Sequence, residues 1–302
     1  MRTDYTTTSR GLRTGSFPMR LYEKAKRLGV WNPAEIDFSR DREDWQELDE
    51  ERQVAILELT AQFVAGEEAV TLDLLPLVMT IAKEGRLEEE LFLTTFLFEE
   101  GKHADFFSRW LREVAEAPTD LSEYLTPTYQ QILAEELPQT MSALLEDDSP
   151  HALARAATTY NMVVEGVLAE TGYWSYHRSL AVNGLMPGLC EGLVNIKRDE
   201  SRHIAYGVYL LSRLVAEDAS VWDVIETRMN ELFPLTTALV DEGFEEGVDE
   251  TPFGVTQEET LAYATGQFSK RYERIAKARG RTLAELDADP EPDDVADLVS
   301  EL

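Results

Sequence analysis

The sequence contains 302 residues, of which 43% are hydrophobic and 28% are charged, and its formal net charge is −30. A chain of this length can bury a large core in one domain or at most two, whereas its negative charge argues against nucleic acid or anionic lipid as a partner, since both would be repelled. No segment reaches the roughly eighteen apolar residues of a membrane span, the N-terminus lacks the apolar middle of a secretory signal, and the single cysteine, Cys190, fits a reducing cytoplasm.

An N-terminal arm of mixed composition covers about residues 1–45 and contains one short amphipathic stretch, PMRLYEKAKRLGV. Helical periodicity then continues with few breaks. The expected long helices cover about residues 45–83, 87–115, 121–146, 150–182, 187–216, 220–245 and 256–279. Strand signals are nearly absent, and an acidic tail covers about residues 281–302. The sequence therefore predicts a single all-α domain over residues 1–302, built as a helical bundle.

Two of these helices begin with recognisable capping residues. Ser149 and Pro150 are typical of an N-cap and a first-turn proline. Thr256 and Glu259 have the spacing of a capping box. Both positions therefore predict a helix start.

Two of the four histidines close the motif Glu-x-x-His, as Glu100–His103 in EGKH and Glu200–His203 in ESRH. Residues three apart share one face of a helix, so each pair can point at the same object. Imidazole and carboxylate together suit manganese, iron or zinc. Because glutamate is abundant in this sequence, the doublet alone is only moderate evidence for a metal site.

A further glutamate lies upstream of each pair inside an apolar helix: Glu67 in QFVAGEEAVTLDLLPLV and Glu165 in YNMVVEGVLAETGYW. Dinuclear carboxylate proteins have this arrangement: two helices each supply a glutamate, and two others each supply a Glu-x-x-His motif. Four buried carboxylates without cations would be prohibitive, and two divalent ions would neutralise them. The alternative is a set of surface or ion-paired carboxylates, and the adjacent Glu68 leaves the first ligand open.

The remaining candidate groups have ordinary expectations. Glu58 and Glu170 are expected at a packing edge or in solvent. His151 follows a predicted helix start and is expected to be exposed. His177 lies near a helix end, where a capping or surface role is more common than metal binding.

At this point the residues resemble the ferritin-like superfamily and, within it, the ribonucleotide reductase small subunit. This resemblance implies a four-helix bundle core with additional helices. The stretch RDESRH matches that family's Asp-Glu-x-x-His, in which the aspartate, here Asp199, contacts a metal-bound histidine from outside the site. Two departures argue against a radical-generating subunit: Phe107 stands where the radical tyrosine is expected, and the tail DDVADLVSEL lacks a tyrosine. Phenylalanine also occurs there in a manganese/iron reductase class.

The sequence is more similar to the R2-like ligand-binding oxidase family, over about residues 15–280. The stretches that carry this resemblance are AGEEAVTLDLLP, EEGKHADFF, YNMVVEGVLAETGYW and KRDESRHIAYG. The resemblance implies one manganese and one iron ion per chain, with di-iron as a variant. The implied ligands are Glu67, Glu100 and His103 for manganese, and Glu165, Glu200 and His203 for iron.

The same resemblance implies an ether cross-link between Val70 and Tyr160, and it selects Glu67 over Glu68 because only Glu67 has a valine three residues later. Val70 shares a helix face with Glu67. Tyr160 is less well supported, since five residues turn an α-helix about 140° away from Glu165. From the residues alone, Val70 and Tyr160 would be ordinary core side chains.

The expected activity is that of an oxidase that uses dioxygen to remove hydrogen from the Cβ of Val70, with Tyr160 supplying the ether oxygen. The family also binds a long-chain fatty acid in an apolar tunnel, and small-subunit relatives are usually homodimers. The alternatives are a ribonucleotide reductase small subunit, another di-iron oxygenase or desaturase, and a ferritin-like iron store.

Overall fold

The computed structural model describes residues 5–117, 120–244 and 247–288, and its regular structure is helical. Segments labelled η are 3-10 helices (η1, η3) or π-helices (η2, η4, η5, η6). The bounds are α1 (Thr6–Ser9), α2 (Phe17–Leu28), η1 (Pro33–Glu35), α3 (Ser39–Glu47), α4 (Glu50–Lys83), α5 (Leu87–Trp110), η2 (Leu111–Ala115), η3 (Ser122–Tyr124), α6 (Pro127–Gln130), η4 (Gln131–Glu136), α7 (Leu137–Ala143), α8 (Pro150–Ala157), η5 (Thr158–Ala169), α9 (Glu170–Tyr176), η6 (His177–Ala181), α10 (Pro187–Glu217), α11 (Val221–Glu242), α12 (Gln257–Ala276) and α13 (Leu283–Asp287). The predicted all-α class is confirmed.

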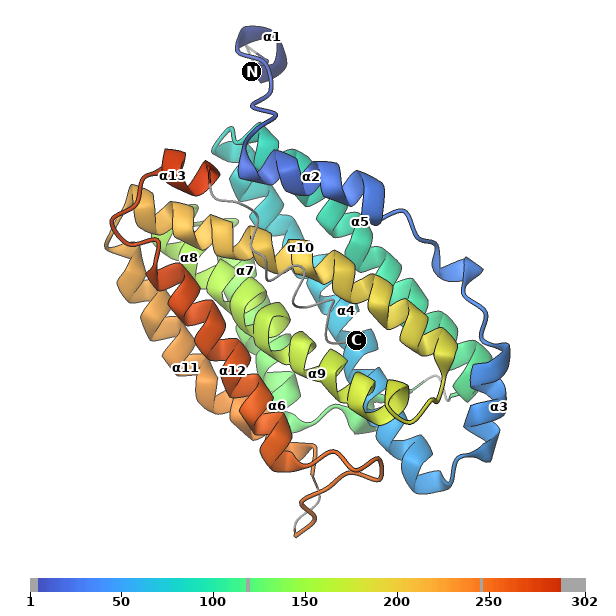
Figure 1. Cartoon of the computed structure of the whole chain (residues 1–302). Helices are drawn as coiled ribbons and strands as arrows, with labels where there is room; N and C mark the ends of the chain where they lie inside the picture. Colours follow the sequence, from blue (N-terminus) through green and yellow to red (C-terminus); the bar gives the residue numbers. More distant parts are fainter. Residues whose placement is uncertain (1–4, 118–119, 245–246, 289–302) are drawn as a thin grey trace.

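The centre of the molecule is formed by α4, α5, α10 and the long helix that runs from α8 through η5 and α9 to η6 (Figure 1). α4 packs against α5, α5 against α10, and α10 against η5. α11 and α12 cover the outer side of η5, while α2 lies against both α5 and α10. These contacts confirm the bundle core with additional helices around it.

The predicted capping residues are confirmed. The Ser149 hydroxyl accepts a hydrogen bond from the backbone N–H of Ala152 at the start of α8. Thr256 and Glu259 form the reciprocal capping box at the start of α12. Each cap satisfies a backbone donor that the first helical turn leaves unpaired.

Two helix boundaries and the N-terminal arm differ from the prediction. The helix expected from about residue 45 begins at Glu50, because the Asp49 carboxylate caps it and Leu48 is extended. The segment expected as one helix over 121–146 is divided, and its main part begins at Pro127, where proline is tolerated because the first-turn N–H is unpaired anyway. The N-terminal arm is largely helical in α2 and α3, and α2 buries Phe17 and other apolar residues of the amphipathic stretch.

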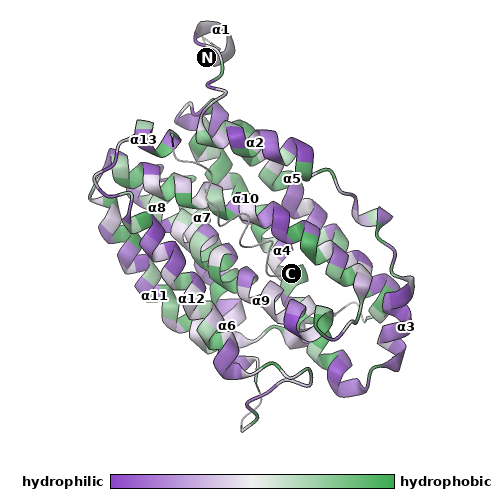
Figure 2. Ribbon diagram, viewed as in Figure 1, coloured by the Kyte–Doolittle hydropathy of each residue, from purple (hydrophilic) through white to green (hydrophobic). Residues whose placement is uncertain are grey.

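Hydrophilic residues are frequent along the outer elements α3 and α11, whereas hydrophobic residues gather toward the bundle interior (Figure 2). Within the described ranges, no helix is long and apolar enough to cross a membrane. The first part of the predicted tail forms α13, where the Tyr209 hydroxyl donates to the Asp287 carboxylate across 3.1 Å. The stretch DDVADLVSEL lies outside the described residues.

Candidate metal centre

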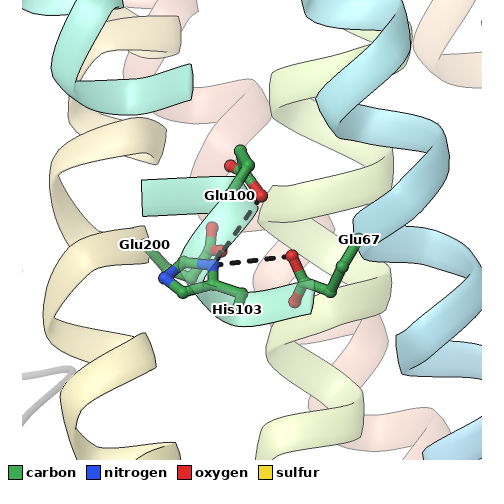
Figure 3. Close-up of side chains that lie close together, drawn as sticks. All are labelled: Glu67, Glu100, His103 and Glu200. Carbon is green, nitrogen blue, oxygen red and sulfur yellow. Dashed lines mark ion pairs between the residues drawn. The ribbon is translucent and has the colours of Figure 1, made fainter. Parts of the chain in front are cut away.

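All six side chains that the sequence predicts as metal ligands meet in the middle of the bundle. Four helical segments supply them: Glu67 from α4, Glu100 and His103 from α5, Glu165 from η5, and Glu200 and His203 from α10. None is more than 5% exposed. Figure 3 shows four of them pointing toward a common centre. The exposed Glu68 points elsewhere, which favours Glu67 as the group from α4.

The six side chains form two overlapping groups, in each of which the candidate ligand atoms lie within 4.8 Å of one another. One group contains Glu67, Glu100, His103 and Glu200; the other contains Glu100, Glu165, Glu200 and His203. Sequence reasoning gave Glu100 and Glu200 to one site each. The geometry instead places both glutamates between the two groups, where each can reach two ions.

The two imidazoles present the same atom to the centre. His103 Nδ1 lies 3.2 Å from Glu200 Oε1 and 3.5 Å from Glu67 Oε2. His203 Nδ1 lies 2.9 Å from Glu100 Oε1 and 3.4 Å from Glu200 Oε2. The Nδ1 atoms are therefore the candidate ligand atoms, and both Nε2 atoms face outward.

Buried ligand atoms without hydrogen-bond partners test whether metal ions fit this centre. Five of its ligand atoms are buried without a hydrogen-bond partner: Glu100 Oε1, His103 Nδ1, Glu165 Oε1, Glu200 Oε2 and His203 Nδ1. Each unsatisfied buried polar group costs about 1–3 kcal/mol. Cations would satisfy all of them at once, and mixed carboxylate and imidazole donors suit manganese and iron. The residues fit a pair of metal ions.

The electrostatics of the centre also favour cations. Burial raises the pKa of Glu67 to about 8 and holds the pKa of Glu165 well above its usual range. At Glu100 burial acts in the same direction, but His203 and His103 outweigh it and lower the pKa. Without metal, protons must therefore neutralise part of this cluster, and metal ions would displace those protons.

An outer pair of carboxylates faces the two histidines crosswise. Asp199, the residue before Glu200 on α10, lies beside the histidine of α5, with its Oδ2 3.4 Å from His103 Nε2. Glu99, on α5, lies beside the histidine of α10, with its Oε2 2.9 Å from His203 Nε2. Asp199 was singled out from the sequence, but Glu99 was missed. Its position directly before Glu100, equivalent to that of Asp199, was the available signal.

Val70 and Tyr160 are both buried beside this centre. Tyr160 lies in η5, where backbone hydrogen bonds reach five residues back, so residues five apart come round to about the same face. The expected 140° separation of Tyr160 from Glu165 was therefore wrong, because it assumed α-helical geometry. Burial, reinforced by Glu100 and Glu165, raises the pKa of Tyr160 well above its usual range, so the hydroxyl keeps its proton.

The other sequence expectations had mixed outcomes. Glu58 and His151 are exposed, as predicted, and the ring of His151 contacts the Ser220 hydroxyl. His177 is half-buried and belongs to neither metal-ligand group. Phe107 is fully buried and stacks on Phe63 with ring centroids 5.1 Å apart.

The expectation for Glu170 was wrong. This side chain is only 1% exposed. Burial raises its pKa, and the opposing charges come from Arg271 on α12 and Lys197 on α10. These cations belong to other helices, so the local sequence around Glu170 could not reveal them.

An apolar cavity opens onto the metal centre. Its walls include Leu59, Phe63, Leu133, Val164, Leu168 and Leu239. Glu67, Glu100, Glu165 and Glu200 line the same cavity, and Val70 borders it. Pockets with mostly apolar walls and a few converging polar groups are typical of small-molecule sites.

This fold and centre define a ferritin-like bundle protein with a dinuclear carboxylate site. The family model described as ribonucleotide reductase, small chain, matches residues 19–271. A solved structure of an R2-like ligand-binding oxidase with an aerobically reconstituted Mn/Fe cofactor is 40% identical, with 93% of this chain and 100% of that chain covered and a TM-score of 0.89. A tyrosine-to-phenylalanine mutant of R2-like ligand-binding oxidase, also with an Mn/Fe cofactor, is 42% identical. The match covers 91% of this chain and 99% of that chain, with a TM-score of 0.86.

A third solved structure is a glycine-to-leucine mutant of R2-like ligand-binding oxidase with an Fe/Fe cofactor. It is 40% identical, and the match covers 91% of this chain and 99% of that chain with a TM-score of 0.87. The chain belongs to the R2-like ligand-binding oxidases, within the ribonucleotide reductase small-chain family. Relatives therefore carry Mn/Fe or Fe/Fe, and this chain has a buried carboxylate–histidine cluster able to hold a metal pair.

Proposed function

We propose that this protein is an oxidase that holds one manganese and one iron ion and reduces dioxygen. Manganese would be held on the His103 side with Glu67, and iron on the His203 side with Glu165. Glu100 and Glu200 would reach both ions. The main support for this proposal is that five buried ligand atoms have no hydrogen-bond partner. The Mn/Fe cofactor of the relatives supports it further.

When bound, a reduced Mn/Fe pair would donate electrons to dioxygen and so provide an oxidant that is strong enough to remove hydrogen from carbon. The protein's own contribution is close apolar packing around the ligands. Phe96 stacks on the His203 ring with the ring centroids 3.7 Å apart, and both side chains are fully buried. Excluding water in this way protects a strong oxidant from side reactions.

We further propose that Val70 and Tyr160 are the first target of this oxidation. Ether formation removes one hydrogen from the Val70 Cβ and one from the Tyr160 hydroxyl, which together carry two electrons and two protons to dioxygen. The reduced metal pair would supply the other two electrons and acid in solution the other two protons, so one dioxygen would yield two waters. The burial of both residues beside the centre supports this proposal.

A long-chain fatty acid is the proposed ligand of the cavity. Its tail would lie against the apolar walls, and its carboxylate would face the metal centre. The cavity is lined mostly by apolar side chains, and its four carboxylates all belong to the metal centre, which supports this orientation. Two trivalent ions would outweigh four carboxylates in charge, which favours an additional anionic group in a dry site.

A homodimer is the proposed assembly. Helix α4 exposes Leu72, Leu75 and Met79, at 67%, 43% and 53% respectively. Their spacing of three and four residues places them along one helix face, where a second copy could cover them. Sedimentation of the wild type and of Leu72→Glu tests this, since a charged residue at a dimer interface should give monomer. A monomeric wild type would contradict the homodimer, and a Leu72→Glu variant that stays dimeric would contradict this interface.

Intact-mass measurement on unfolded protein tests the oxidase proposal. After aerobic reconstitution with Mn(II) and Fe(II), the wild type should lose two hydrogen atoms, and digestion should give a linked peptide containing Val70 and Tyr160. Tyr160→Phe should keep its full mass. Tyr129→Phe, which changes a buried tyrosine that lines the cavity, is the matched control and should still cross-link. An unchanged wild-type mass would reject the cross-link.

A further inference from the structure

The two outer carboxylates, Glu99 and Asp199, are joined by one guanidinium group. Arg202 Nη2 lies 2.6 Å from Glu99 Oε1 and 2.5 Å from Asp199 Oδ1. All three side chains are at most 1% exposed. With the buried Lys102, which lies 2.9 Å from Asp199 Oδ2, this outer layer contains two anions and two cations. It therefore adds no net charge to the metal centre, so any effect on the ions depends on how its contacts are distributed.

The contacts are distributed unequally. Asp199 accepts from Arg202, from Lys102 and from the Trp31 indole N–H across 2.7 Å, and its contact with His103 is long at 3.4 Å. Glu99 accepts from Arg202 and contacts His203 at 2.9 Å. The carboxylate beside His203 thus faces one cation, while the carboxylate beside His103 faces two cations and an indole.

The backbone is shaped to admit Glu99. A Cβ atom at Gly29, which follows α2, would lie 2.1 Å from Glu99 Oε1. The Gly29 carbonyl also accepts from Lys102 Nζ across 2.8 Å. The residue after α2 therefore leaves room for one outer carboxylate while it holds the cation that neutralises the other.

Hydrogen bonding from outside changes the strength of an imidazole ligand. A carboxylate that accepts from the outer ring nitrogen raises the basicity of the inner one. This effect is largest where the hydrogen bond is short and the carboxylate keeps most of its negative charge. His203 has the shorter contact, at 2.9 Å from Glu99. His103 lies 3.4 Å from Asp199, a carboxylate that is also contacted by two cations and an indole.

We propose that Glu99 is a positioning residue that makes His203 the stronger of the two imidazole donors and so directs iron to its side of the centre. Fe(II) gains more than Mn(II) from a strong nitrogen donor, in line with their intrinsic affinities. The weaker donor, His103, leaves its side to manganese. This inference rests on the proposed Mn/Fe function, and it supplies a basis for distinguishing two sites that have nearly the same ligands.

The test is metal binding to Glu99→Gln, which keeps the side-chain shape but removes the charge. We expect anaerobic chelator competition to give an Fe(II) affinity on the His203 side about 10- to 100-fold weaker than in the wild type. Anomalous diffraction at the manganese and iron edges should show a lower iron fraction there. Glu89→Gln is the matched control, because Glu89 is another buried glutamate of α5 paired with an arginine, Arg213, and contacts no histidine.

Lys102→Gln provides a second variant with the opposite expected result. Removing this cation leaves Asp199 less compensated, so His103 should become the stronger donor and the iron fraction on its side should rise. If Glu99→Gln fails to fold, Lys102→Gln alone decides. This inference would be overturned, and the proposed oxidase left intact, by the following result. The wild type binds Mn and Fe normally, and both variants show the same metal distribution as Glu89→Gln. Wild type that binds no metal would overturn the proposed function itself.

Discussion

Helices α5 and η5 both carry buried candidate ligands, but their backbones space side chains differently. α5 is a regular α-helix, so Glu100 and His103 share one face, as the Glu-x-x-His spacing predicts. η5 has wider π-helical turns, which bring Tyr160 and Glu165 toward the same face although α-helical spacing would separate them. Spacing rules thus locate ligands reliably only where the backbone hydrogen-bond pattern is the assumed one.

The largest expected effect distinguishes a shared ligand from an unshared one. Glu100→Ala removes a carboxylate that belongs to both metal-ligand groups, so both ions should be lost, with affinity reduced by more than about 100-fold. Glu165→Ala removes a member of one group and should keep the ion on the His103 side. Metal analysis after dialysis measures this, with Glu68→Ala as an exposed control. Equal retention by the two variants would contradict the shared role of Glu100.

The backbone of η5 should tolerate a methyl group poorly. A Cβ atom at Gly166 would lie 2.9 Å from the Asn161 carbonyl oxygen and 3.1 Å from Arg271 Nε. Gly166→Ala should therefore lower the free energy of unfolding by about 1–3 kcal/mol, as overpacking does. Urea denaturation of metal-free protein gives this value. A variant as stable as the wild type would mean that η5 has room the structure does not show.

The equivalent change in α5 should have the opposite sign. Gly101 is exposed, and nothing lies within 4 Å of the Cβ position. Gly101→Ala should raise the free energy of unfolding by up to about 1 kcal/mol, because alanine restricts the unfolded chain and favours the helix. The same denaturation series measures it. Destabilisation here would remove the contrast between the two helices.

The smallest effect is expected at the start of α5, away from the ligands. Glu88 binds Arg10 and Arg13, and the hydrogen bond from Arg10, the largest cause, lowers the pKa of Glu88 to about 2. A carboxylate with a lowered folded pKa contributes stability above its ordinary pKa, near 4.5, and this contribution is lost as the pH falls toward about 2.

Glu88→Gln should therefore cost no more than about 1 kcal/mol at neutral pH, since both arginines are exposed. Denaturation of wild type and variant across the acidic range measures the difference. It should shrink as the pH falls from about 4.5 to about 2. A difference that stays constant with pH would assign the stability to packing.

The sequence allowed most of the centre to be predicted, because its ligands follow helical spacing within single segments. His103 and Glu100 are an example, since α5 is regular throughout that stretch. Two contacts between distant segments were not predicted. The burial of Glu170 depends on cations from α10 and α12, and the crossing of Glu99 to His203 depends on how α5 packs against α10. The break at Leu48 was also missed: Leu48 is extended, and the Asp49 carboxylate caps a new helix directly after it.

The central claim is that the chain holds one manganese and one iron ion, and element analysis tests it most directly. Wild-type protein is reconstituted in air with equal Mn(II) and Fe(II), and free metal is removed before the measurement. We expect one manganese and one iron per chain, held by the six buried side chains that otherwise leave five ligand atoms without hydrogen-bond partners. A chain that retains no stoichiometric transition metal and stays equally stable would contradict the account.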